Sequence, residues 1–426
     1  MTDKKKEQGG NGALALAASL GLTVLSSLSA AEAQLAATPG SIRPFRANIA
    51  QAKLDDMRRR IAATQWPEKE TVADATQGVQ LAKMQKLAAY WATDYDWRKL
   101  EARLNGYPQF VTEIDGVDIH FIHVRSSHEN ALPLIVTHGW PGSVVEQLEI
   151  IEPLTDPTAH GGTAADAFDV VIPSIPGYDF SGKPAVTGWD PPRVARAWTV
   201  LMKRLGYQRF VAQGGDWGSL ITDQMGVQAP PELLAIHTNL PSAVPAEIAQ
   251  ALPTHLPPPG LPAEEKRAFE QLDAFLSNGL AYALEMAQRP QTVSYGLTDS
   301  PAGLLGWMYE KFNEWSDSGG DAGTVLTPDQ MLDDVSLYWL TETAASSSRL
   351  YWENKLPFFA PTGVRIPVGV SVFPAELYRC PRSWAARAYP HLIHFNDKLE
   401  NGGHFAAWEQ PGLLTSEIRA TFRTLR

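Results

Sequence analysis

Cysteine is nearly absent from this sequence of 426 residues, in which Cys380 is the single example. One cysteine can form neither an intramolecular disulfide nor a metal site that uses several thiolates. We therefore expect Cys380 to be a small, packed side chain without a chemical role.

Long basic runs and long apolar runs are also missing from most of the chain. The net charge is −11, and no lysine- or arginine-rich run follows the first few residues, so nucleic acid is not an expected partner. Beyond the N-terminus no apolar run reaches the ~20 residues that span a bilayer, and no integral membrane span is expected. The composition, 44% hydrophobic and 19% charged, is that of a globular protein.

The N-terminus has the pattern of a targeting signal. Residues 4–6 are lysines, a small and apolar stretch follows from Ala13 to about Leu28, and residues 31–33 read Ala-Glu-Ala. A basic start, an apolar stretch and an A-x-A cleavage pattern are typical of a signal peptide. We predict a signal peptide over residues 1–33 and export to the periplasm or the medium. A disordered leader on a cytoplasmic protein is the alternative.

Changes of pattern divide the remaining chain into four parts. Residues 34–109 begin with a small-residue linker and continue as a Trp-rich helical region, which we interpret as a helical meander. Residues 110–240 and 356–426 alternate short apolar runs with helical patterns and form the predicted core. Between them the strand signal fades, and residues 241–355 are Pro-rich, then helical and aromatic, as expected of an inserted helical lid.

The core has the pattern of an α/β protein. Strands are predicted over residues 110–114, 117–124, 132–137, 168–172, 210–213, 233–238, 364–373 and 392–395, and helices over 193–205, 219–227 and 412–425. Asp115-Gly116 predicts a hairpin turn between the first two strands. Strands that alternate with helices predict a mostly parallel sheet covered on both faces.

The central motif is Gly-Gly-Asp-Trp-Gly at residues 214–218, between a predicted strand and a helix. That context is typical of the nucleophile elbow of α/β hydrolases, normally G-x-S-x-G. The middle residue here is Asp216, and a carboxylate that attacks carbon forms an ester. This chemistry suits alkylating substrates such as epoxides or haloalkanes. A glycine-rich turn with an aspartate helix cap is the simpler alternative.

A second motif, His-Gly-Trp-Pro-Gly at residues 138–142, directly follows a strand of the predicted sheet. In α/β hydrolases this loop supplies one backbone N–H of the oxyanion hole, and the residue after the nucleophile supplies the other. Trp140 and Trp217 are the corresponding residues. Both donors would stabilise the negative oxygen that forms when water attacks the ester. We interpret His138 as a structural residue that holds the loop.

A general base and its acid partner are predicted from the last part of the chain. His404 follows Gly402-Gly403, after the last strand and before the last helix, and so completes the order nucleophile, acid, base. Glu376 ends the preceding strand and is the predicted acid, which would hold the His404 tautomer. Asp397 and Glu400 are alternatives close to His404 in sequence.

These motifs resemble those of the microsomal-type epoxide hydrolases, which include the juvenile hormone epoxide hydrolases of insects. The resemblance extends from about Ile42 to the end of the chain. It includes residues 94–98 and 104–110 of the N-terminal region and Phe-Pro-Ala-Glu-Leu at residues 373–377. It implies an α/β-hydrolase fold with a lid and an N-terminal meander. The family's membrane anchor is not carried over, because this leader looks cleavable.

The resemblance also implies two lid tyrosines whose hydroxyls hydrogen-bond the epoxide oxygen. One closes the segment Ser-Arg-Leu-Tyr, which is Tyr351 here. The other lies eight residues before Pro290, which points to Tyr282, with Tyr295 as the second choice. A half-buried lid aromatic is the alternative for each of them.

The implied reaction converts an epoxide and water to a vicinal diol. Asp216 would form an ester, and water activated by His404 and Glu376 would hydrolyse it, with no metal or organic cofactor. Trp307, Phe312 and Trp315 favour a small apolar epoxide, although they could simply pack the lid. A haloalkane or haloacid dehalogenase of the same fold, which would use halide donors such as tryptophan, is the first alternative. A binding protein without activity is the second.

Overall fold

The computed structural model describes residues 40–426. The predicted signal peptide, residues 1–33, lies outside this range. Contacts divide the chain into residues 1–42 and residues 43–426, and the second unit contains every helix and strand given below. No helix among the described residues is long and apolar enough to cross a membrane.

Nine strands of the described chain form one sheet, in the order β1-β2-β3-β5-β4-β6-β7-β8-β9. They are β1 (Arg43–Phe45), β2 (Gln109–Ile114), β3 (Val117–Val124), β4 (Leu132–Thr137), β5 (Phe168–Pro173), β6 (Phe210–Gly214), β7 (Leu233–Thr238), β8 (Val368–Ser371) and β9 (Leu392–Asn396). The strands from β5 to β9 in this order run parallel, whereas β1, β2 and β3 extend the sheet antiparallel. The sheet is mostly parallel, as predicted.

The hairpin turn between β2 and β3 lies where the sequence predicts it. Asp115 and Gly116 have φ angles of 52° and 81°, the left-handed conformation that two-residue hairpin turns require. Two strand predictions need correction. The strand expected over residues 364–373 is confined to β8, because Pro367 directly before it has no amide to donate. β1 was not expected, since three residues are too few to show a strand pattern.

The helices fall into three groups along the chain. The N-terminal helices are α2 (Gln51–Ala62), α3 (Leu81–Thr93) and α4 (Trp97–Leu104). The helices around the sheet are α5 (Leu148–Thr155), α6 (Pro191–Arg204), α7 (Trp217–Gln228), α15 (Arg382–Ala388), α16 (Ala406–Glu409) and α17 (Pro411–Phe422). Between β7 and β8 come α8 (Ala246–Ala251), α9 (Ala263–Ala274), α10 (Ala281–Gln288), α11 (Pro290–Asp299), α12 (Pro301–Trp315), α13 (Pro328–Thr341) and α14 (Ala344–Glu353). We call residues 246–353 the helical insertion.

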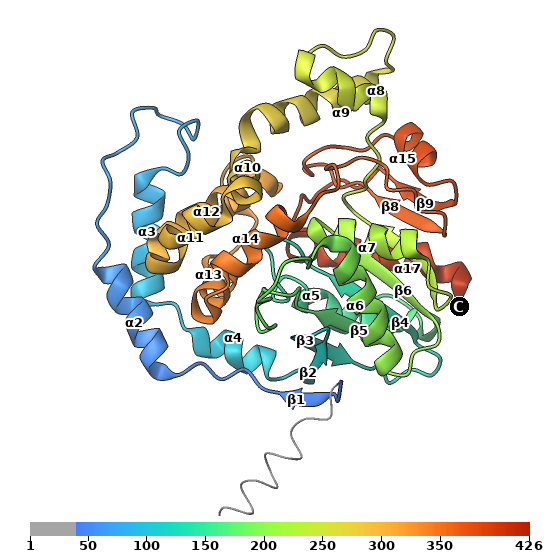
Figure 1. Ribbon diagram of the computed structural model, residues 1–426, viewed down its shortest axis with the longest axis horizontal. Helices are drawn as coiled ribbons and strands as arrows, with labels where there is room; N and C mark the ends of the chain where they lie inside the picture. The colour runs from blue at the N-terminus through green and yellow to red at the C-terminus, as the bar shows by residue number, and fades with distance from the viewer. Residues whose placement is uncertain (1–39) are drawn as a thin grey trace, which may run out of the picture. The chain divides into compact units, whose positions relative to one another are not determined.

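Helices α2 and α3 pack against α12 of the helical insertion, which lies between them and the sheet (Figure 1). Helix α4 packs against α13 and lies beside β2 and β3. Buried apolar residues at three- and four-residue spacing, such as Leu54, Met57 and Ile61, give α2 its packed face. Polar contacts add to the packing: the indole N–H of Trp91 donates to Ser336 of α13 at 2.9 Å. The Tyr95 hydroxyl donates to Asp333 of the same helix at 2.8 Å. The N-terminal region therefore helps to hold the insertion in place.

Candidate active site

Asp216 stands at a sharp turn between β6 and α7. Its backbone has φ 51° and ψ −128°, a conformation that is strained for a residue with a side chain. The glycines on either side leave the space that the turn needs. A Cβ on Gly214 would collide with the carbonyl of Gly218, and a Cβ on Gly218 would collide with the carbonyl of Thr137. This geometry explains the glycine pattern and is that of a nucleophile elbow.

His404 lies between the other two residues of the predicted triad, within hydrogen-bonding distance of Glu376 on one side and of Asp216 on the other. His404 Nδ1 lies 2.7 Å from Glu376 Oε1, and His404 Nε2 lies 3.2 Å from Asp216 Oδ2. The alternatives to Glu376 lie elsewhere. The carboxylate of Asp397 pairs with Lys398 at 3.3 Å, and Glu400 is exposed. The structure therefore brings together the three residues of the predicted triad.

The charges around His404 decide its protonation. Burial alone would lower the pKa of the imidazole, but the carboxylates of Glu376 and Asp216 outweigh burial and hold the pKa well above its usual value. An imidazolium with Nδ1–H donating to Glu376 and Nε2–H donating to Asp216 fits both distances. Loss of either negative charge would lower the pKa of His404 again.

The loop after β4 places a backbone donor on Asp216. The N–H of Trp140 donates to Asp216 Oδ1 at 2.7 Å. Gly139 lets the loop approach Asp216, because a Cβ at position 139 would collide with the Asp216 carboxylate. Trp217 is the first residue of α7, and first-turn amides have no acceptor within their own helix. Both predicted oxyanion donors thus lie beside Asp216.

His138 lies behind this loop and is buried. Its Nδ1–H donates to the carbonyl of Gly139 at 3.0 Å, and its Nε2 accepts from the N–H of Ile175 at 3.2 Å. Both ring nitrogens are therefore engaged with backbone groups. This arrangement agrees with the interpretation of His138 as a residue that holds the loop.

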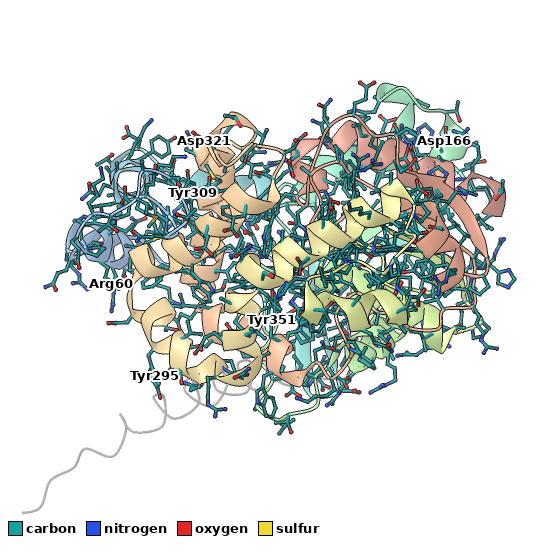
Figure 2. All side chains as sticks on the ribbon, turned by 90° about the horizontal axis from the view of Figure 1, so that it is seen from above. Arg60, Asp166, Tyr295, Tyr309, Asp321 and Tyr351 are labelled. Carbon is teal, nitrogen blue, oxygen red and sulfur yellow. The ribbon has the colours of Figure 1, made fainter. Side chains whose placement is uncertain are left out.

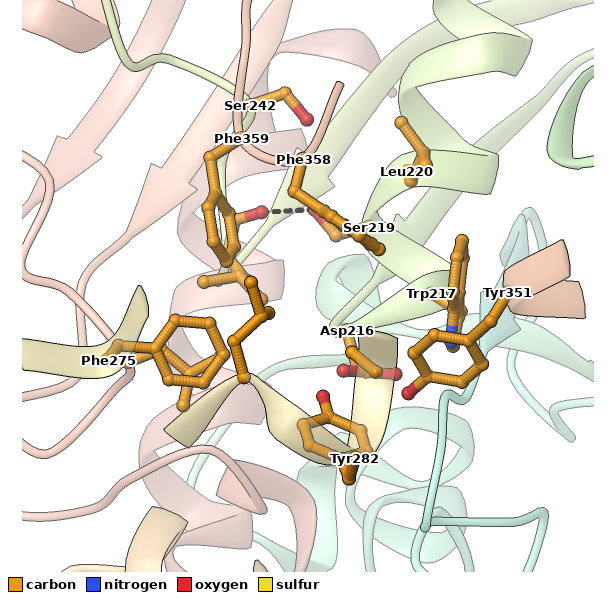
Figure 3. Close-up of a pocket in the computed structure, with 14 residues that line it drawn as sticks. Asp216, Trp217, Ser219, Leu220, Ser242, Phe275, Tyr282, Tyr351, Phe358 and Phe359 are labelled. Atoms are coloured by element: carbon orange, nitrogen blue, oxygen red, sulfur yellow. Dashed lines mark hydrogen bonds between the residues drawn. The ribbon is translucent and has the colours of Figure 1, made fainter. Parts of the chain in front are cut away.

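Two tyrosines of the helical insertion face Asp216 across a cavity. Figure 3 shows the hydroxyls of Tyr282, from α10, and Tyr351, from α14, pointing toward the carboxylate. Burial and the nearby charge of Asp216 raise the pKa of both phenols well above the usual value. Both are therefore neutral donors at physiological pH. Tyr295, the second choice, is 71% exposed on α11 and lies far from Tyr351 at the edge of the molecule (Figure 2).

Apart from Ser219 and Ser242, the rest of this cavity is apolar. It is lined by Leu220, Leu240, Phe275, Leu280, Phe358, Phe359 and Leu377. The aromatic residues that the sequence suggested do not line it. Phe312 packs on Phe405, and Trp315 packs between Tyr282 and His404, with ring centroids 5.3 and 4.9 Å away. The apolar lining therefore comes mainly from residues that the sequence did not single out.

A second, smaller cavity adjoins Asp216 and His404 and has a polar lining. Glu146, Gln147, Gln213 and Asn239 contribute side chains to it. Burial raises the pKa of Glu146 to about 8, so this carboxyl is mostly protonated at neutral pH. The sequence analysis missed these residues, because no local pattern distinguishes a buried glutamate or glutamine from a surface one.

No group of three or more His, Cys, Asp or Glu side chains in residues 40–426 is arranged to hold a metal ion. Cys380 is buried, and burial raises the pKa of its thiol to about 12. A thiol in this state is a poor nucleophile.

Comparison with known proteins agrees with this chemistry. A family model described as epoxide hydrolase N terminus matches residues 42–147, and one described as alpha/beta hydrolase fold matches residues 133–285. A protein of Stigmatella aurantiaca whose name marks it as a candidate epoxide hydrolase is 52% identical over 385 residues, which are 90% of this chain and 86% of that protein. This chain belongs to the epoxide hydrolase family.

More distant members support the same assignment. Epoxide hydrolase 1 of Sus scrofa is 35% identical, over 90% of this chain and 89% of that protein. The crystal structure of juvenile hormone epoxide hydrolase from Bombyx mori has a TM-score of 0.80 at 32% identity, over 91% of this chain and 96% of that one. The predicted family, the hydrolase class and the α/β-hydrolase fold are thus confirmed.

Proposed function

We propose that this member of the epoxide hydrolase family converts an apolar epoxide and water to a vicinal diol through an ester on Asp216. The observation that carries the proposal is the facing pair: a carboxylate on the elbow and two phenol hydroxyls across one apolar cavity. Nucleophile and acid would then act on adjacent atoms of one three-membered ring.

In the first step, a carboxylate oxygen of Asp216 attacks an oxirane carbon and the C–O bond of the ring breaks. The oxygen that leaves becomes an alkoxide, which is strongly basic and needs a proton donor. Tyr282 and Tyr351 would hold this oxygen, and one of them would transfer its proton. The product of the step is a glycol ester on Asp216.

In the second step, water hydrolyses the ester. Esterification removes the negative charge of Asp216, and His404 then loses one of the two carboxylates that raise its pKa. The imidazolium can then give up its proton, which would return to the phenolate that remains after the phenol has protonated the alkoxide. Neutral His404, held by Glu376, would take a proton from water as the water attacks the carbonyl. Trp140 and Trp217 would donate their N–H groups to the oxyanion. The intermediate would then collapse, and the glycol oxygen would leave with the proton from His404 as the diol. The proton left on the Asp216 carboxyl would pass to His404, which restores the carboxylate and the imidazolium.

The polar cavity supports the second step. Its lining by Glu146, Gln147 and Gln213 suits water, whereas the apolar cavity on the tyrosine side suits the substrate. The two cavities adjoin the same carboxylate. Water would thus reach the ester without displacing the glycol chain. The helical insertion, which carries both tyrosines, would be the lid over this site.

The haloalkane or haloacid dehalogenase remains the alternative function. Trp217 lines the apolar cavity and Trp140 lies beside Asp216, so two tryptophans that could bind a halide lie near the nucleophile. A departing halide, however, is a stable anion that needs no proton. Two buried phenols aimed at the nucleophile therefore favour the epoxide.

We expect Tyr282→Phe and Tyr351→Phe each to slow ester formation about ten- to a thousand-fold, a loss of roughly 1.4–4 kcal/mol of transition-state stabilisation. The reason is that each change removes a donor from the alkoxide. Hydrolysis of an ester already formed should change much less, because His404 and the backbone donors act there. Single-turnover kinetics with an aromatic epoxide resolves the two steps.

Tyr295→Phe is the matched control for these variants, because its exposed phenol lies outside the cavity. It should open the epoxide at the rate of the unchanged protein. Chloride release should be tested in parallel with a haloalkane. If both cavity variants open the epoxide at the full rate, or if halide release is the faster reaction, the dehalogenase replaces the epoxide hydrolase as the proposed function.

We also propose that residues 1–33 are a signal peptide and that the protein is exported. The support is the order of basic, apolar and Ala-x-Ala segments in the sequence. In a bacterial host with its own signal peptidase, the exported protein should begin near Gln34, which N-terminal sequencing can measure. An exported protein that begins at Met1 or Thr2 would contradict cleavage.

A further inference from the structure

A buried lysine lies directly behind one of the two tyrosines. Lys311, on α12, has a side chain that is only 3% exposed, which is unusual for a lysine. Its Nζ lies 4.8 Å from the centroid of the Tyr282 ring and 5.6 Å from that of Trp315. The ammonium is therefore in contact with the π-system of a phenol whose hydroxyl points at Asp216.

Lys311 also forms two ion pairs with residues of its own helix. Its Nζ is 2.5 Å from Glu310 Oε1 and 3.0 Å from Glu314 Oε2. These two glutamates are partly exposed, at 36% and 45%, so water screens their charges in part. The charge of Glu314 still raises the pKa of Tyr282 and so opposes the lysine at this phenol. Because Lys311 is buried, its positive charge lies on the side of α12 that faces the protein interior.

We propose that Lys311 is a positioning residue that stabilises the negative charge appearing on Tyr282 when this phenol gives its proton to the opening epoxide. The inference rests on the proposed function. A neutral ring attracts an ammonium weakly through its quadrupole, and a phenolate ring attracts it through a full charge. The attraction therefore grows along the reaction, which is the condition for lowering the barrier rather than only binding the substrate.

The same geometry separates the roles of the two tyrosines. Tyr282 has the lysine over its ring, whereas the ring of Tyr351 packs against those of Trp140, Trp217 and Tyr282. A hydrogen bond between the two hydroxyls lowers the pKa of Tyr282 and raises that of Tyr351, against the larger effect of burial on both. Tyr282 is thus the phenol that transfers its proton, and Tyr351 remains a hydrogen-bond donor.

The test is the rate of ester formation in Lys311→Met, which keeps an unbranched side chain only one atom shorter and removes the charge. We expect this rate to fall about ten- to thirty-fold, the range of a desolvated cation–π contact. Lys311→Arg keeps the charge and should recover most of the rate. Hydrolysis of the ester should be unchanged in both variants. Lys355→Met is the matched control, since Lys355 lies 4.8 Å from the ring centroid of Trp352 but is exposed and outside the cavity.

A double-mutant cycle with Tyr282→Phe separates this role from packing. In the Tyr282→Phe background no phenolate can form, and Lys311→Met should cause no further loss. Equal slowing of both steps, a full additional loss in that background, or no rescue by arginine would overturn the proposal. Failure of the proposed function is a different result, namely full-rate ring opening in Tyr282→Phe itself.

Glu314→Gln provides a test that does not depend on removing a buried lysine. The substitution is on a partly exposed side chain and leaves Lys311 with one carboxylate fewer, so more of its charge acts on Tyr282. Ester formation should become faster by up to about three-fold, as expected for the loss of a partly screened charge. An unchanged or lower rate would contradict the proposed charge effect.

Discussion

Asp216→Ala should abolish diol formation, with a loss of about 10⁴-fold or more, as for removal of a catalytic nucleophile. The remaining groups could bind and polarise the epoxide but could form no ester. The protein should still fold, because the Asp216 side chain points into a cavity and supports no packing. A φ of 51° is energetically less favourable for alanine than for aspartate, so we expect the free energy of unfolding to decrease by about 1 kcal/mol. Diol release and chemical denaturation measure the two effects.

Asp397→Asn and Glu400→Gln are suitable controls for this variant. Both remove a carboxylate that lies near His404 in sequence but does not contact it in the structure. Each should leave diol formation within about two-fold of the unchanged protein, as for surface substitutions. Near-normal activity in Asp216→Ala would refute the ester mechanism, and a large loss in either control would mean that the acid has been misassigned.

His404→Gln should separate the two steps by stopping only the second. Ring opening needs the Asp216 carboxylate and the tyrosines, which this change leaves in place. Hydrolysis needs a base for water, and glutamine cannot serve as one. The ester should therefore accumulate, with its hydrolysis slowed by about 10³-fold or more. Intact-protein mass spectrometry should find the protein plus the mass of one substrate molecule.

Peptide mapping should place the added mass on the segment that contains Asp216. The double variant Asp216→Ala/His404→Gln is the control and should acquire no mass, because it has no nucleophile. If His404→Gln binds substrate and yet forms no adduct, His404 also acts in ring opening and the proposed division of steps is wrong. The result does not depend on which epoxide is natural, provided that the substrate used is turned over by the unchanged protein.

Local chemistry explains why much of this site could be predicted from sequence. The elbow needs glycines at 214 and 218 because backbone atoms approach closely there. The two glycines can be read directly from the sequence, so they predict the elbow. Asp216, Glu376 and His404 each follow a strand of the parallel part of the sheet, namely β6, β8 and β9. Carboxyl ends of parallel strands meet at one edge of the sheet, so the chain order already implies that these side chains converge.

The sequence by itself determined the family, the fold class, the elbow and the residues of the predicted triad. The tertiary structure decided the questions that depend on how helices pack. Tyr282 and Tyr295 lie on neighbouring helices, yet one is 7% and the other 71% exposed. Glu146 and Lys311 gave no signal, because charged residues are usually at the surface and no nearby residue marks these as buried. Their environment is made by segments distant in sequence, and only packing brings those together.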